Sequence, residues 1–235
     1  MQLSSAVALV TGANRGLGVH LAQQLRDRGA TVYAGARDPE AITYPGVTPV
    51  RVDVTDQASI DAAFEVTGPV SVLVNNAGSS TGATLLDGDL DQIGVEFDTH
   101  VFGSLAMIRR YAPAMNAWSE SAVVNILSVL SWFTIPRVGA YCAAKSAAWS
   151  MTNSIRQELL PQGTRVTGLH VGYMDTEMAR GIDAPKSDPA DVARLAVDAI
   201  ERGEFEVIAD DISRFVRAGL SGGVGELYPT LVTAR

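Results

Sequence analysis

The sequence has few of the features that mark extracellular, membrane or nucleic-acid-binding proteins. Its 235 residues include one cysteine, Cys142, so no disulfide can form within the chain. No apolar run reaches the roughly 18 residues of a membrane-spanning helix. The excess of acidic over basic residues, 26 against 18, gives a formal net charge of -8 and disfavours a nucleic-acid surface. We expect a cytoplasmic protein without nucleic-acid or membrane partners, and we assign no metal ligands.

Lysine is also scarce, which makes the position of one lysine informative. Only Lys145 and Lys186 are present, and Lys145 stands four residues after Tyr141. On a helix, residues i and i+4 share a face, so the ammonium is expected beside the phenol. A nearby positive charge stabilises tyrosinate and lowers a pKa that is ordinarily near 10. The pair therefore predicts proton transfer, with Cys142 packed beside it as a small residue.

A glycine-rich turn lies near the N-terminal end of the sequence. The apolar run 6–10 is typical of a buried strand, and residues 19–25 have helical apolar spacing after the turn. Gly12 permits a sharp turn, Gly16 allows the backbone to approach a pyrophosphate, and Gly18 allows close helix packing. The helix N-terminus then faces the phosphates of a dinucleotide.

Several segments together resemble the short-chain dehydrogenase/reductase family over nearly the whole chain. Residues 11–18 resemble its Thr-Gly-x-x-x-Gly-x-Gly loop, and residues 75–78 its Asn-Asn-Ala-Gly segment. Ser128, Tyr141 and Lys145 match its catalytic triad in order and spacing. The resemblance, together with a charge argument for Arg15 and Arg37, implies cofactor contacts from Gly12, Asn14, Arg15, Gly16, Leu17, Gly18, Arg37, Asp53, Val54, Asn76, Ala77, Gly78, Tyr141, Lys145, Gly172, Met174 and Thr176.

Two positions depart from the family pattern. Residues 172–176 resemble a stretch whose threonine holds the nicotinamide carboxamide, but Val171 replaces its usual proline. We expect a less restrained loop there, since valine does not fix φ. His100 stands where relatives usually carry an asparagine, in the helix after the fourth strand. It is either a polar residue satisfied within a helix bend or a proton relay, because imidazole titrates near neutrality.

Alternating strand-like and helix-like segments predict a single α/β domain over residues 1–235. We expect a Rossmann-type doubly wound sheet of about seven parallel strands, with helices on both faces. The strands are predicted at Val7–Thr11, Thr31–Ala36, Val47–Asp53, Ser71–Asn75, Ser121–Leu127, Arg165–Val171 and Phe205–Ala209. The segment 37–47 is short and holds two prolines, which predicts at most a turn or two of helix. Asp188, Pro189 and Gly203 predict the cap, first turn and end of a later helix.

The charge pattern favours NADP(H) over NAD(H). NAD enzymes of this architecture usually place an acid at the end of the second strand to bind the adenosine ribose, but Ala36 stands there. Arg37 and Arg15 are instead expected to converge on a 2′-phosphate. In the alternative, both arginines are surface residues and Asp38 binds the ribose of NAD.

The resemblance implies hydride transfer between NADPH and a carbonyl or hydroxyl substrate. Ser128 would hold the substrate oxygen, Tyr141 would donate its proton, and Lys145 would bind the nicotinamide ribose and support the tyrosine. Apolar residues near these positions suggest a hydrophobic ketone or aldehyde, although they are equally typical of core or subunit contacts. They are Trp132, Phe133, Ile135, Tyr173, Met174 and Met178.

Two other functions stay open at this point. One is a 3-oxoacyl thioester reductase, which the acidic balance disfavours. The other is a dinucleotide-sensing protein with little turnover, which His100 and Val171 favour and the intact triad opposes. The family's habit of pairing the Tyr141 helix across a two-fold axis implies a homodimer or homotetramer.

Overall fold

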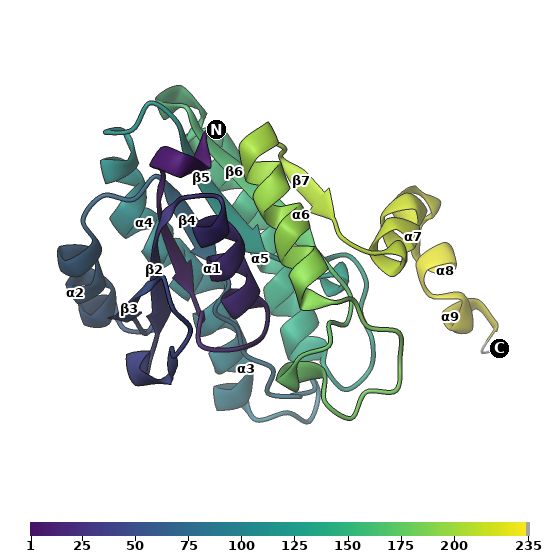
Figure 1. The fold of residues 1–235 in the computed structure, drawn as a ribbon. Coiled ribbons are helices and arrows are strands. Elements are labelled where there is room, and N and C mark those ends of the chain that lie inside the picture. The colour runs from purple at the N-terminus through teal and green to yellow at the C-terminus, as the bar shows by residue number, and fades with distance from the viewer. Residues whose placement is uncertain (234–235) are drawn as a thin grey trace.

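Seven parallel strands form one sheet in the computed structural model, which describes residues 1–233 (Figure 1). The strands are β1 (Val7–Thr11), β2 (Thr31–Ala36), β3 (Thr48–Arg51), β4 (Val72–Asn75), β5 (Ser121–Ile126), β6 (Thr164–His170) and β7 (Glu206–Ile208). Their order across the sheet is β3-β2-β1-β4-β5-β6-β7. The order reverses between β1 and β4, and in doubly wound sheets ligands bind at the carboxyl ends of strands at such a reversal.

Helices cover both faces of this sheet. They are α1 (Gly16–Asp27), α2 (Gln57–Thr67), α3 (Leu90–Phe97), α4 (Ser104–Met115), α5 (Gly139–Glu158), α6 (Pro189–Arg202), α7 (Asp211–Gly219), α8 (Val224–Leu227) and α9 (Pro229–Thr233). The last three project beyond β7 (Figure 1). Within residues 1–233, no helix combines the length and apolar character needed to cross a bilayer.

The predicted elements are confirmed, with differences of one to two residues at most strand ends. β1 and β2 have the expected bounds, whereas the third strand is shorter, Thr48–Arg51. The segment 37–47 holds one 3₁₀ turn, Pro39–Ala41, as its prolines indicated. At α6, the carboxylate of Asp188 accepts a hydrogen bond from the N–H of Ala190 at 2.8 Å. The helix ends at Gly203 with φ of +69°.

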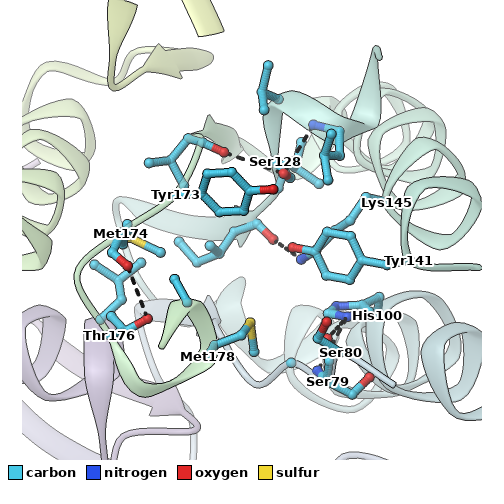
Figure 2. A pocket seen from close by; sticks show the side chains of 18 of the residues that line it. Ser79, Ser80, His100, Ser128, Tyr141, Lys145, Tyr173, Met174, Thr176 and Met178 are labelled. Atoms are coloured by element: carbon cyan, nitrogen blue, oxygen red, sulfur yellow. Dashed lines mark hydrogen bonds between the residues drawn. The ribbon is translucent and has the colours of Figure 1, made fainter. Parts of the chain in front are cut away.

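One π-helical segment, Asp98–Gly103, joins α3 to α4. His100 lies inside it, so the helix departs from regular α geometry where a bend was expected. The wider π turn interrupts the regular hydrogen-bond ladder, and such turns are frequent at functional sites. Figure 2 shows His100 beside the ring of Tyr141 and the segment containing Ser79.

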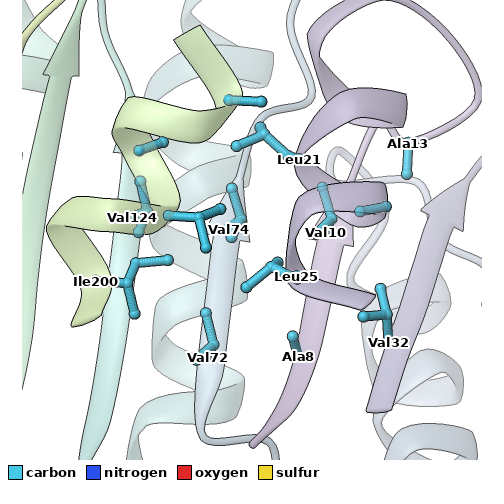
Figure 3. Close-up of a cluster of buried hydrophobic side chains, with 14 of the residues drawn as sticks. Ala8, Val10, Ala13, Leu21, Leu25, Val32, Val72, Val74, Val124 and Ile200 are labelled. Atoms are coloured by element: carbon cyan, nitrogen blue, oxygen red, sulfur yellow. The ribbon is translucent and has the colours of Figure 1, made fainter. Parts of the chain in front are cut away.

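The core consists of two apolar layers, one on each face of the sheet. Because strand side chains alternate, Val10 and Val74 face α1 and α6, whereas Leu9 and Leu73 face α2, α4 and α5. The first layer, shown in Figure 3, also contains Ala8, Val32, Val72, Val124, Leu21, Leu25 and Ile200. This rigid packing fixes the strand ends from which the functional side chains project.

Candidate active site

A cleft with a volume of about 1520 Å³ opens at the carboxyl ends of the strands. All of the residues predicted to bind the cofactor line it except Gly18. His100 and Ser128 line it as well, so segments from across the sequence meet in one place. The cleft lies at the order reversal between β1 and β4, where a dinucleotide is expected.

The glycine turn has the close packing that its sequence predicted. Gly12 has φ of +63°, and a Cβ there would lie 2.9 Å from the Cα of Ala77. A Cβ on Gly18 would collide with the carbonyl oxygen of Gly12, so Gly18 packs the helix on the turn and does not line the cleft. The hydroxyl of Thr11 accepts hydrogen bonds from the N–H groups of Asn76 and Ala77, both at 3.0 Å. The turn and the segment 75–78 therefore form one cradle, which fits a dinucleotide lying against exposed backbone.

The three residues of the predicted triad also meet in the cleft. Tyr141 and Lys145 share one face of α5, and the Lys145 nitrogen lies 5.6 Å from the centre of the Tyr141 ring. Lys145 is buried and donates a hydrogen bond to the carbonyl oxygen of Ile126 at 2.8 Å. Ser128 follows β5, where its hydroxyl accepts from the N–H of Leu130 at 3.1 Å. Figure 2 shows Ser128, Tyr141 and Lys145 facing the same space.

The expected lowering of the Tyr141 pKa is wrong for this arrangement. Burial raises the pKa of Tyr141, the Ser128 hydroxyl opposes that change, and the Glu96 carboxylate adds to it. The Lys145 ammonium donates to a backbone carbonyl, and burial lowers the pKa of Lys145 to about 8. Tyr141 is consequently a neutral phenol at pH 7, which is the form that can donate a proton.

His100 is buried and held by polar neighbours. Its Nε2 lies 3.0 Å from the carbonyl oxygen of Ser79 and 3.3 Å from the carboxylate of Glu96. Its ring meets the edge of Tyr141 at a centroid distance of 5.2 Å, and burial lowers the pKa of His100. These contacts support the interpretation of a polar residue satisfied within a helix bend. A proton-relay role stays a hypothesis.

The loop after β6 has a restraint that replaces the missing proline at Val171. The carboxylate of Asp210, at the start of α7, accepts a hydrogen bond from the N–H of Gly172 at 2.6 Å. The same oxygen lies 3.4 Å from the hydroxyl of Ser187, where the loop returns. A charged acceptor makes a stronger hydrogen bond than a neutral one, so the loop is tied at both ends to α7.

The other end of the cleft is charged and exposed. Arg15 forms an ion pair with Glu177 at 2.7 Å, and both side chains are more than half exposed. Arg37 also lines the cleft, and its charge acts on Asp53. Burial alone would raise the pKa of Asp53, but hydrogen bonds from Thr55 and the charges of Arg37 and Arg51 lower it. The carboxylate of Asp38 caps the 3₁₀ turn by accepting from the N–H of Glu40 at 3.1 Å.

Beyond Ser128 and Tyr141 the cleft is mainly apolar. Its walls include Leu130, Phe133, Ile135, Tyr173, Met174, Met178, Phe215, Val216 and Leu227. Of the six apolar residues for which the sequence left pocket and core roles open, five are on this wall. The sixth, Trp132, is buried in the core and stacks on His170 with ring centroids 3.7 Å apart. Tyr228 stacks on Phe133 and accepts a hydrogen bond from the N–H of Thr134 at 3.0 Å.

Two polar residues of the site were not found by sequence reasoning. Glu96 is one helical turn before His100, so a Glu-x-x-x-His pattern was available as a signal. Asp210 is far along the chain from Gly172, and no local pattern indicates their contact. The ion pair between Arg15 and Glu177 was likewise invisible, because it depends on how the loop after β6 folds back over the glycine turn.

Comparison with known proteins identifies the family. Residues 6–187 match the model of the short chain dehydrogenase family, and the chain therefore belongs to it. It is an oxidoreductase of the NAD(P)-dependent dehydrogenase and reductase class.

Individual relatives agree with this assignment. The chain is similar to a short chain dehydrogenase from Burkholderia cenocepacia in complex with NADP, with a TM-score of 0.92, 34% identity, and 98% and 99% of the two chains covered. A Burkholderia phymatum short chain dehydrogenase/reductase in complex with NAD gives a TM-score of 0.83 and 25% identity, covering 92% and 93%. The 3-oxoacyl-[acyl-carrier-protein] reductase MabA of Mycobacterium avium is 34% identical over 76% of this chain and 71% of the relative.

Proposed function

We propose that the protein is an NADP-dependent reductase of hydrophobic ketones or aldehydes, acting reversibly on the corresponding alcohols. The observation that carries this proposal is the junction of two unlike surfaces at Tyr141. On one side lies the glycine cradle with two arginines, and on the other an apolar wall. A carbonyl at this junction is within reach of both a hydride donor and a proton donor.

The chain's own residues supply orientation and the proton. The hydroxyl of Ser128 donates to the substrate oxygen, which turns the carbonyl carbon toward the cofactor. Tyr141 gives its phenolic proton to that oxygen as negative charge develops. Lys145 would stabilise the tyrosinate that remains and, with the cofactor bound, would hydrogen-bond the nicotinamide ribose. When bound, NADPH supplies the hydride.

The preference for NADP(H) rests on charge at the exposed end of the cleft. Arg15 and Arg37 both line this end of the cleft, and the carboxylate of Asp38 is already engaged as a cap, which supports binding of a 2′-phosphate there. Guanidinium groups bind phosphate through paired, charge-assisted hydrogen bonds. For this to occur, Arg15 exchanges its exposed partner Glu177 for the phosphate, at little cost since exposed ion pairs are weak.

A 3-oxoacyl thioester reductase is the second candidate, and the likeness to MabA favours it. Against it, the cationic residues that line the cleft, within the described part of the chain, are Arg15, Arg37 and Lys145. None of these lies along the apolar wall where a carrier's phosphate would have to pass.

We also propose that the protein forms a homodimer or homotetramer. Light scattering after size-exclusion chromatography would test this proposal. The cytoplasmic location stays a prediction.

A screen of NADPH oxidation tests the proposed function. Hydrophobic ketones, aldehydes and short 3-oxoacyl thioesters are supplied in turn, with NADPH or NADH, and absorbance at the nicotinamide band is followed. We expect turnover with at least one hydrophobic ketone or aldehyde and faster turnover with NADPH. Faster turnover of thioesters would favour the second candidate. Tight NADPH binding without turnover on any substrate would favour a dinucleotide-sensing protein.

A further inference from the structure

Glu96 is a buried carboxylate beside the proposed reaction centre to which the mechanism above gives no task. Its side chain has no exposed surface and lies on α3, one turn before His100. Burying a carboxylate without partners is energetically costly, so the hydrogen bonds of Glu96 indicate its role in the site.

Hydrogen bonds tie Glu96 to the wall of the cleft. One carboxylate oxygen accepts from the N–H of Thr81 at 2.5 Å, and the other accepts from the hydroxyl of Ser79 at 2.7 Å. Both donors belong to the segment that follows Gly78, in which Ser79 and Ser80 line the cleft. Glu96 therefore fixes the segment that lies between the cofactor cradle and the substrate space.

Glu96 also fixes the orientation of His100. The Nε2 of His100 lies 3.0 Å from the Ser79 carbonyl oxygen, and it lies 3.3 Å from both the Glu96 carboxylate and the N–H nitrogen of Ser79. The imidazole cannot rotate without losing these contacts. Its fixed ring supports the edge of Tyr141, whose position sets the path of the transferred proton.

The negative charge of Glu96 acts on two buried residues of α5, Tyr141 and Lys145. Glu96 opposes the lowering of the Lys145 pKa by burial, and it raises the pKa of Tyr141. The other titratable groups that act here are His100, Cys142, His170 and Tyr173. Burial lowers the pKa of His100 and lowers that of His170 to about 4, and burial raises that of Cys142. Glu96, with its pKa lowered to about 2, is the negative charge among the named groups at pH 7.

We propose that Glu96 is a positioning residue of the active site. Through His100 and the segment 79–81 it holds the substrate side of the cleft in place, and it provides the buried counter-charge for Lys145. This inference rests on the proposed function, because Lys145 and Tyr141 matter only if they serve the reaction. The effect of Glu96 on the geometry of the site and the effect of its charge can be measured separately.

Two substitutions separate the effects. Glu96→Gln keeps the length and an acceptor for the N–H of Thr81 but removes the charge. Because the Glu96 charge raises the pKa of both Lys145 and Tyr141, we expect its removal to move the alkaline fall of reductase activity down by about one pH unit. Glu96→Asp keeps the charge but shortens the reach, so we expect the alkaline fall to stay and the KM for the carbonyl to rise several-fold. Glu158→Gln, an exposed change of the same charge on α5, is the matched control.

A second readout needs no turnover. The dissociation constant of NADPH is measured against pH by nicotinamide fluorescence, and the loss of affinity as Lys145 deprotonates should occur about one unit lower in Glu96→Gln. Thermal unfolding checks that each variant is folded. An alkaline fall of activity and of NADPH affinity that is the same in the parent, Glu158→Gln and Glu96→Gln would overturn the inference. Failure of the proposed function is distinct from this, since the parent itself would then bind NADPH but reduce no substrate.

Discussion

The two ends of the cleft differ in burial, and the difference corresponds to different tasks. At the reaction end, Lys145, Glu96 and His100 are buried and hydrogen-bonded to fixed neighbours. At the proposed adenosine end, Arg15 and Arg37 are exposed, and the partner of Arg15 is a surface glutamate. Interactions between charges are strongest where water is excluded, so the buried end is suited to stabilising the charges that develop during a reaction. The exposed end suits recognition of a charged group that arrives from water.

Tyr141→Phe should give the largest loss. The ring still packs against His100, but the proposed proton donor is gone, so turnover should fall by about 100-fold or more while NADPH affinity changes by no more than a few-fold. Steady-state kinetics and NADPH fluorescence titration measure the two quantities. Turnover close to that of the parent would remove Tyr141 from the mechanism.

Lys145→Ala should damage both quantities. The ammonium is proposed to serve the tyrosine and the nicotinamide ribose together, so NADPH affinity should fall by roughly 10-fold or more in addition to a loss of turnover. The same two assays apply, with Lys186→Ala as the matched control at the other lysine. If NADPH affinity is unchanged, Lys145 does not bind the ribose.

Arg37→Asp tests the exposed end. It removes a proposed phosphate ligand and places an acid near the ribose, so the ratio of kcat/KM for NADPH over NADH should fall by roughly 10 to 150-fold. Arg15→Ala should change the ratio in the same direction but less, because Arg15 is already paired with Glu177. If the parent protein prefers NADH, the two arginines are surface residues and Asp38 is the residue expected to bind the ribose.

His100→Asn should have a small effect. Asparagine can still accept and donate hydrogen bonds in the π-helical segment, so activity is expected within about 10-fold of the parent. The pH-rate profile decides between the two hypotheses for His100. Disappearance of a group titrating near neutrality, with a large loss of rate and an intact fold, would instead identify a proton relay.

The sequence predicted the fold well because its signals are local. Buried parallel strands appear as apolar runs, and Gly12, Asp188 and Gly203 mark turns and helix ends through their own conformational preferences. The positions of Ser128, Tyr141 and Lys145 followed from spacing and family resemblance. These signals do not depend on how distant segments pack.

The predictions that were wrong or missing depend on contacts between residues that are distant in the sequence, or on burial in the folded chain. The direction of the Tyr141 pKa was wrong because burial raises this pKa by more than the Ser128 hydroxyl lowers it, and burial is a property of the folded chain. The link between Asp210 and Gly172 joins residues 38 positions apart in sequence. For Trp132 the sequence left a pocket role and a core role open, and the structure places its ring in the core, stacked on His170.

The proposed contrast between a buried reaction centre and an exposed phosphate-binding end is tested most directly by ionic strength. Salt screens exposed charges over about 10 Å at 0.1 M and over about 3 Å at 1 M, and it screens buried groups much less. We predict that kcat/KM for NADPH falls several-fold as salt is raised, while kcat with saturating cofactor and kcat/KM for NADH stay nearly constant. An equal fall for both cofactors, or a fall in kcat, would contradict the account.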